Sequence, residues 1–207
     1  MEGKIFRNLE NRSAWAEQEK LKPKSFSLLV EGKFTRDELA VSLVAPGSSI
    51  THDSESEAAV NVTWSQLLAS GLKAWPNDTK PTRYRFVTAI TEEDTLCVVL
   101  DPCVSYKDYA AGKAPEFRAT FGKEYQPNPV GVNTVIIAKD AEGKDRMLLT
   151  LRSDAHDYKA GGYQVGTGGF MEIKKDSSPF DTAIREMKEE SGIDPEECEE
   201  LVCRGIV

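Results

Sequence analysis

Three glutamates near the end of one short segment are the residues of this chain best placed to do chemistry. They are Glu186, Glu189 and Glu190, and their i+3 and i+4 spacing puts side chains on one side of an α-helix. Carboxylate oxygens are preferred ligands of Mg²⁺, which keeps further positions for water and phosphate oxygens. The spacing therefore predicts an acidic surface that holds Mg²⁺, or Mn²⁺ as a substitute, against a diphosphate.

The helix that would position these glutamates has recognisable ends. Ser178 suits the N-cap with Asp181 three positions on, Pro179 suits the first helical position, and Gly192 suits the C-terminal stop. Between these ends an apolar stripe recurs at helical spacing, formed by Phe180, Ala183, Ile184 and Met187. We predict a helix that packs with one side and exposes its acidic side next to it.

The acidic side of this helix has an electrostatic cost. Three glutamates near the carboxyl end oppose the helix dipole, and Glu186 and Glu190 repel each other, each effect amounting to roughly a few tenths of a kcal/mol. A bound dication would turn this repulsion into attraction. The alternative is a solvated charged surface, with Arg185 and Glu189 as an ordinary i,i+4 ion pair. The upstream Gly168-Gly169 turn favours the metal site, because its backbone carbonyls could complete a coordination shell.

The segments Gly168–Glu172 and Arg185–Gly192 together resemble the signature box of the Nudix hydrolases, a superfamily that cleaves nucleoside diphosphates linked to another moiety. This resemblance implies a nucleotide substrate, a magnesium cofactor and metal-assisted hydrolysis of a phosphoanhydride. The candidate catalytic residues are Arg185, Glu186 and Glu189. The candidate metal ligands are Glu186, Glu189, Glu190 and the backbone of Gly169, and Gly168 and Glu172 are candidates for substrate contact.

The box departs from the family pattern at one acidic position. The family commonly has a glutamate eight residues before the arginine, where this chain has Ser177, and the spacing from Gly169 to Arg185 is longer than usual. We therefore expect Asp176 or Glu172 to orient Arg185 instead. Glu172 matches the acidic residue that often follows the glycine pair, and its alternative is a carboxylate on a surface loop.

The region before the box resembles the Nudix-type UDP-sugar diphosphatases. The resemblance rests on Trp64–Leu68, Pro81–Phe86, Ser105–Tyr109 and Asn128–Val132. It implies hydrolysis of UDP-glucose or UDP-galactose to UMP and a sugar 1-phosphate. Arg83 or Arg85 could then contact a phosphate through its guanidinium, whereas Tyr106 and Tyr109 are expected to pack rather than to stack on uracil. The alternative function is a catalytically weak or inactive module that binds a nucleotide or a protein partner.

The predicted fold is α+β: a Nudix-type α/β/α sandwich at residues 126–207, preceded by a smaller α/β region at residues 1–125, with the division at the prolines of 126–129. In the first region we expect strands at 26–30, 84–90 and 96–100, a helix capped by Thr35 and a helix over about 57–70. In the second we expect strands at 132–138, 147–151 and 200–207 around the acidic helix. Only 15 residues follow Gly192, so we expect an incomplete sandwich whose open edges favour a homo-oligomer.

Composition and charge exclude several other classes of protein. A net charge of −8 and a pI near 5.0 argue against a nucleic-acid surface, which needs clustered Lys and Arg. No apolar run reaches membrane-spanning length and the amino terminus lacks a secretion signal, so we expect a cytoplasmic protein without membrane partners. The four cysteines lack metal-site spacing and are expected to be free thiols. His52 and His156 have no Cys or Ser partner for nucleophilic catalysis.

Overall fold

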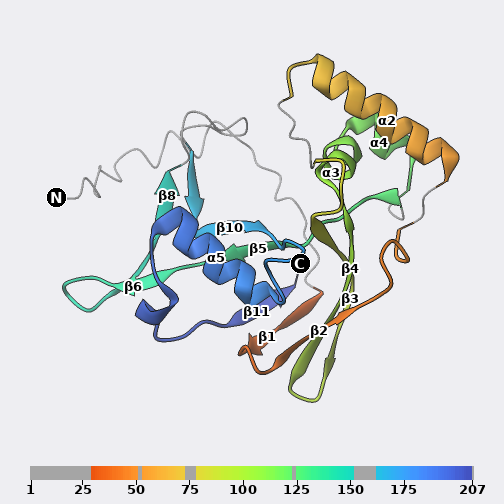
Figure 1. The fold of residues 1–207 in the computed structure, drawn as a ribbon. Helices are drawn as coiled ribbons and strands as arrows, with labels where there is room; N and C mark the ends of the chain where they lie inside the picture. The colour runs from red at the N-terminus through yellow and green to blue at the C-terminus, as the bar shows by residue number, and fades with distance from the viewer. Residues whose placement is uncertain (1–28, 51–52, 73–77, 123–124, 152–161, 207) are drawn as a thin grey trace.

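The computed structural model describes residues 29–50, 53–72, 78–122, 125–151 and 162–206. It has the predicted α+β architecture, with helices packed on several small sheets, of which the three-stranded sheet is mixed (Figure 1). Among the described residues, no helix is both long enough and apolar enough to cross a membrane. His52 and His156 lie outside the described residues, as does most of the strand expected at 26–30.

The second half of the chain builds antiparallel strand pairs and one long helix. Strand β5 (Gly131–Thr134) pairs with β10 (Thr167–Phe170), and helix α5 (Pro179–Ser191) lies against both (Figure 1). Two further pairs form two-stranded ribbons, β6 (Ile137–Lys139) with β7 (Asp145–Met147), and β8 (Leu149–Leu151) with β9 (Tyr163–Val165). After the short turn η3 (Pro195–Glu197), the described chain ends in β11 (Cys203–Ile206).

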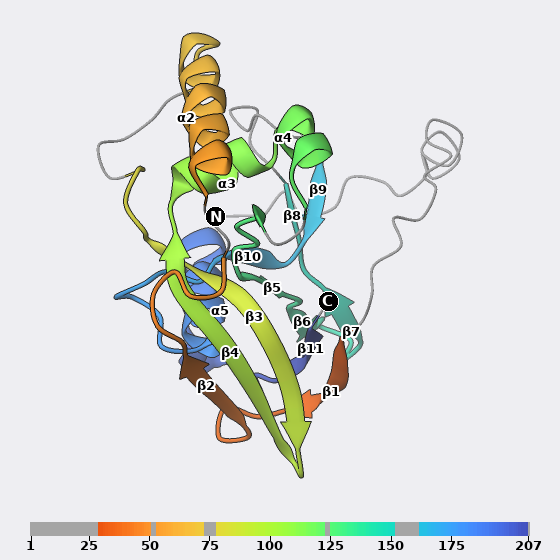
Figure 2. The same ribbon diagram turned by 90° about the vertical axis from the view of Figure 1, so that its right-hand side faces the viewer.

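The first half contributes a long hairpin and a group of helices. Strand β3 (Arg83–Glu92) pairs antiparallel with β4 (Thr95–Val104), and β2 (Leu39–Leu43) runs parallel to β4 on its other side. Helices α2 (Ser54–Ala69), α3 (Tyr106–Gly112) and α4 (Pro115–Thr120) pack together near the end of β4 (Figure 2). Strand β1 (Val30–Phe34) pairs with β11, so the first and last described strands lie side by side.

Backbone hydrogen bonds and a common core join the two halves. Tyr84 on β3 donates to the carbonyl of Met171 at 3.3 Å and accepts from Val130 at 2.9 Å. The main core contains buried side chains from both halves, namely Phe34, Tyr84, Leu96, Val98, Leu100 and Met171. Strand β3 thus fixes the end of β10 from the side, next to the helix that carries the three glutamates. The division at 125/126 stays a prediction, with these contacts crossing it.

Several predictions about local structure were wrong. The helix expected from Arg36 is a turn followed by β2, because the Glu38 carboxylate accepts hydrogen bonds from the Thr35 amide at 2.8 Å and hydroxyl at 2.9 Å. This closes a turn, after which Leu39 and Val41 alternate onto the core. The single strand expected at 132–138 is divided into β5 and β6, since the chain changes its pairing partner from β10 to β7. The strand expected at 147–151 is likewise divided.

The turn expected at Gly168-Gly169 is instead part of strand β10, because both residues pair with β5. The remaining expected elements are present. The hairpin of β3 and β4 is longer than expected at both ends and turns at Glu93, whose φ is +52°. Helix α2 begins before the expected residue 57, because Asp53 and Ser56 form a reciprocal cap. Val60 and Trp64 are its buried anchors.

Candidate functional site

Helix α5 begins and ends at the predicted residues. The Ser178 hydroxyl accepts from the Asp181 amide at 3.3 Å, and the Asp181 carboxylate accepts from the Ser178 amide at 3.0 Å. Pro179 is the first helical residue, and Gly192 adopts a left-handed φ of +74° at the end. Phe180, Ala183 and Met187 are buried toward the sheet while Ile184 is half-buried. This packing fixes which side of the helix carries the glutamates.

The centre of the site is a buried ion pair between Arg185 and Asp176. Asp176 is 4% exposed and accepts from Arg185 Nη2 at 2.9 Å and Nε at 3.2 Å. It also accepts from the Thr182 hydroxyl at 3.1 Å and the Glu172 amide at 2.8 Å. Burial works to raise the pKa of Asp176, but these hydrogen bonds and the Arg185 charge outweigh it and the pKa is lowered. Of the two acidic residues that the sequence offered for orienting Arg185, Asp176 therefore makes the direct hydrogen bonds.

The same guanidinium connects the helix to strand β10 and to two glutamates. Arg185 Nη2 donates to the carbonyl of Phe170 at 3.0 Å. Its Nη1 lies 2.5 Å from Glu186 Oε1, 3.6 Å from Glu189 Oε2 and 3.9 Å from Glu172 Oε1. The hydrogen bond that Arg185 donates to Asp176 is the largest cause of the raised pKa of Arg185, so the guanidinium is a permanent cation. Arg185 is therefore the residue around which the acidic groups gather.

Two of the three glutamates reach the glycine pair. The Glu186 carboxylate lies directly against Gly169, at a point where any side chain on residue 169 would collide with it. Glu190 Oε2 accepts from the Gly168 amide at 3.0 Å. Burial raises the pKa of Glu186, and the charges of Glu190 and Glu189 raise it further, against the opposing effect of Arg185. A side chain at residue 169 would therefore displace the Glu186 carboxylate from this position.

Glu189 is placed differently from its two neighbours. Its side chain is 59% exposed, and Arg185 at 3.6 Å is its ion-pair partner. Within the described ranges, no three His, Cys, Asp or Glu side chains are gathered closely enough to form a metal-binding group. The donor set still suits Mg²⁺ chemically, since it offers carboxylate oxygens whose mutual repulsion a dication would relieve. The metal site at Glu186, Glu189, Glu190 and Gly169 stays a prediction.

The other predicted substrate contacts divide into two groups. Glu172 and Arg83 lie opposite each other in an antiparallel bridge at the end of β10, beside Arg185. Arg85 is 8% exposed and lies apart from them, donating from Nε to the Gln126 carbonyl at 3.2 Å and from Nη1 to the Ser49 carbonyl at 2.5 Å. These contacts give Arg85 a role in holding the loop at Ser49, and its contact with a phosphate stays a prediction.

A buried acid completes the anchoring of that loop. Asp101 is fully buried and accepts from the amides of Gly47 at 2.8 Å and Ser49 at 2.9 Å, as well as from the Ser49 hydroxyl at 2.7 Å. Burial, with the nearby Asp101 charge, raises the pKa of Cys103 to about 12, which keeps this thiol protonated. The four cysteines are free, as expected. Residues 47–49 are therefore held in a fixed position by Asp101.

Two contributors to the site escaped the sequence reasoning. Phe170 acts through its backbone carbonyl, which carries no residue-specific signal. Thr182 is fully buried and donates to Asp176. A threonine one turn before the arginine, within an otherwise apolar helix side, is the only signal that could have indicated it.

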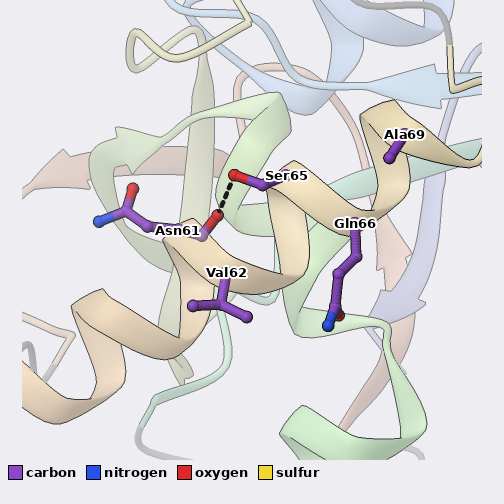
Figure 3. Close-up of a pocket in the computed structure, with 5 residues that line it drawn as sticks. All are labelled: Asn61, Val62, Ser65, Gln66 and Ala69. Carbon is purple, nitrogen blue, oxygen red and sulfur yellow. Dashed lines mark hydrogen bonds between the residues drawn. The ribbon is translucent and has the colours of Figure 1, made fainter.

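A shallow hollow elsewhere on the surface lacks comparable chemistry. It lies along helix α2 and is lined by Asn61, Val62, Ser65, Gln66 and Ala69 (Figure 3). The Ser65 hydroxyl donates to the Asn61 carbonyl at 2.9 Å, so it is engaged within its own helix. With no ionisable lining residue, this hollow offers no acid, base or metal ligand. The candidate site is therefore the acidic side of α5 together with the end of β10.

Comparison with known proteins agrees with this placement. No curated protein matches the chain. Residues 128–204, which include β5, β10, Asp176 and the whole of α5, match the family model of the NUDIX domain. The match to a NUDIX domain supports hydrolysis of nucleoside diphosphate derivatives as the class of activity. The match and the arrangement of Arg185, Glu186 and the glycine pair together support placing this part of the chain in the Nudix superfamily.

Proposed function

We propose that this protein hydrolyses the phosphoanhydride of a nucleoside diphosphate linked to a sugar, with UDP-glucose or UDP-galactose as the substrate and Mg²⁺ as the cofactor. The observation that carries the proposal is the group around Arg185, in which the half-buried guanidinium pairs with Glu186 and Glu189, while Glu186 and Glu190 contact the Gly168-Gly169 part of β10. Nudix hydrolases generally use divalent ions such as Mg²⁺, which fits the oxygen donors present. The UDP-sugar specificity rests on the resemblance of the amino-terminal segments.

The reaction needs a water molecule and a way to stabilise negative charge. The water oxygen bonds to one phosphorus while the bridging P–O bond breaks, so UDP-glucose and water give UMP and glucose 1-phosphate. Glu186, Glu189, Glu190 and the backbone of Gly169 would hold Mg²⁺, which when bound supplies charge neutralisation and a more acidic water. Glu186 is suited to accept the water's proton, because burial and its acidic neighbours raise its pKa. Arg185 keeps that carboxylate directed at β10.

The contacts of Arg185 separate the residues that hold its position from the residues proposed to take part in the chemistry. Asp176 and the Phe170 carbonyl accept from Nε and Nη2 of Arg185, so they hold its position and leave Nη1 for the glutamates, while Thr182 donates to Asp176 and supports it. A group positioned to within a fraction of an ångström is what metal-assisted hydrolysis requires. Ser177, which stands at the family's acidic position, instead donates from its amide to the Asp181 carboxylate at 2.9 Å. The missing acid is therefore supplied one residue earlier, by Asp176.

The test is hydrolysis of UDP-glucose, followed by chromatography of UMP with and without Mg²⁺. We expect product formation that depends on Mg²⁺ and falls at least about 100-fold in Glu189→Gln and Glu190→Gln, since an essential charged group then cannot act. Glu196→Gln is the matched control, because Glu196 is an exposed glutamate on the turn after α5. It should hydrolyse like the native protein. Intact UDP-glucose after long incubation of folded native protein would refute the proposal.

A second function is favoured by one specific observation. In the described part of the chain no three acidic side chains form a metal-binding group, and Glu186 and Glu190 are already engaged by Arg185 and Gly168. A module that binds a nucleotide without turning it over would show this arrangement. Calorimetry separates the two functions, since saturable binding of UDP-glucose with no product at millimolar Mg²⁺ would favour the binding module.

A further inference from the structure

We propose that Arg83, Tyr106, Tyr109 and Phe170 form the binding site for the nucleoside monophosphate part of the substrate, with the rings receiving the base and Arg83 a phosphate. We call these four residues the aromatic–arginine cluster. The inference rests on the proposed function, which it deepens by naming which half of the substrate this part of the molecule recognises. It also assigns helix α3 a part in the site, although α3 lies outside the NUDIX match.

Arg83 is a cation without an anionic partner in the described structure. Its side chain is half-buried, its Nε is fully buried without a hydrogen-bond partner, and no carboxylate forms an ion pair with it within the described residues. Within the described residues, the side chain of Arg83 forms one long hydrogen bond, 3.4 Å from Nη1 to the Thr82 hydroxyl. Partly burying a charge without an anionic partner is costly. An anionic ligand that reached Arg83 would relieve this cost, and a guanidinium suits phosphate oxygens.

The rings around Arg83 are partly exposed and supported from behind. The Arg83 guanidinium carbon lies 5.4 Å from the centroids of both Tyr106 and Phe170. Tyr109 packs edge-on against Phe170, with centroids 4.9 Å apart, and buried Trp64 supports Tyr106 at 6.2 Å. Tyr106, Tyr109 and Phe170 all keep intermediate exposure. An aromatic wall that is rigid on one side and accessible on the other can stack a planar base.

The charge of the cluster selects among aromatic ligands. Lys113 Nζ lies 4.3 Å from the Tyr109 centroid and adds a second cation beside the rings. The protein as a whole carries a net charge of −8, so a positively charged aromatic surface is a local exception. A ligand that is both aromatic and anionic fits this surface best, and a nucleotide combines the two properties in one molecule.

The cluster is continuous with the acidic site. Arg83 lies opposite Glu172 in the antiparallel bridge, and residues paired in this way carry their side chains on the same face. Glu172 lies 3.9 Å from Arg185, whose Nη2 holds the carbonyl of Phe170. Both views place α3 near the end of β10 that carries Phe170 (Figures 1 and 2). A nucleotide on the cluster would therefore present its diphosphate toward Arg185 and the glutamates.

The test measures binding by calorimetry with EDTA present, so that neither Mg²⁺ nor turnover contributes. The probes are UMP and ribose 5-phosphate, which differ by the base. Stacking of a base on aromatic side chains is worth about 1–3 kcal/mol, and we expect UMP to bind native protein about tenfold more tightly than ribose 5-phosphate. Tyr106→Leu should abolish this difference, while the matched variant Tyr106→Phe keeps the ring and should keep the difference.

Arg83 provides an independent variant in case Tyr106→Leu does not fold. Arg83→Gln should weaken UMP and ribose 5-phosphate together by about tenfold, because both carry the phosphate. Equal affinities of native protein for the two probes, or unchanged affinities in Arg83→Gln, would overturn the inference. Mg²⁺-dependent hydrolysis of UDP-glucose, with UMP and ribose 5-phosphate bound equally, would contradict this inference alone. Tighter binding of UMP than of ribose 5-phosphate, without hydrolysis of UDP-glucose, would contradict the proposed function alone.

Discussion

Asp176→Asn is the sharpest test of how the site is held together. The carboxylate of Asp176 is nearly inaccessible and accepts hydrogen bonds from Arg185, Thr182 and the Glu172 amide. Removing one member of a buried pair costs about 3–5 kcal/mol, since the other charge is left uncompensated. Arg185 is 15% exposed, which places the expected loss near the lower end, at about 3 kcal/mol. For a chain of this length that corresponds to a fall in Tm of roughly 6–12 °C.

The assay is thermal unfolding followed by circular dichroism, with Asp145→Asn as control. Asp145 forms an ion pair with Lys139 at 2.7 Å in which both side chains are largely exposed, so its removal should leave Tm unchanged. The pKa of Asp176 is lowered in the folded protein, so its contribution is present above the ordinary pKa of about 3.9 and is lost as the pH falls through the lowered value. The difference between native and variant protein should therefore close in acid.

A double-mutant cycle with Arg185→Gln assigns the loss to the pair. A coupling energy of about 1 kcal/mol or more is expected for two groups in direct contact. If Asp176→Asn melted within about 1 °C of the native protein at neutral pH, the view of Arg185 as a cation fixed by a buried acid would be wrong.

Three further predictions concern single residues. Glu186→Gln should raise Tm at pH 7 without metal: the folded-state pKa of Glu186 is raised, so its stabilising contribution is full below its ordinary pKa and lost as pH rises through the raised value. Gly169→Ala should fold but lose roughly 100-fold in hydrolysis, because the new methyl group displaces the Glu186 carboxylate. Arg85→Lys should lower stability by about 1–3 kcal/mol, because lysine cannot reach both the Ser49 and Gln126 carbonyls.

Each of these predictions has a matched control or a contrary outcome. An unchanged or lower Tm of Glu186→Gln at pH 7 would show that the ionised carboxylate of Glu186 does not destabilise the folded protein. Gly131→Ala is the control for Gly169→Ala, because its new methyl group meets Phe170 only at ordinary contact distance of 3.9 Å. A raised KM with an unchanged Tm in Arg85→Lys would identify Arg85 as a substrate contact instead of a loop anchor.

Local patterns predicted the elements that are defined by nearby residues. The limits of α5 follow from Ser178, Pro179 and Gly192, whose preferences act within one turn, and the structure reproduces them. The hairpin of β3 and β4 was predictable for the same reason. The segment after Thr35 was not, because Glu38 satisfies the same hydrogen-bond donors in a turn that it would satisfy in a helix cap. The following residues then pair with β4, a partner distant in the sequence.

The sequence by itself determined the acidic helix, the glycine pair and the arginine between them, because spacing of a few residues fixes which side chains share one side of a helix. Only the tertiary structure decided that Asp176 holds Arg185, that Glu186 lies against Gly169, and that Arg83 meets Tyr106 and Phe170. These contacts join residues on different elements. Their existence depends on how β3, β10, α3 and α5 pack together, which no local pattern of residues specifies.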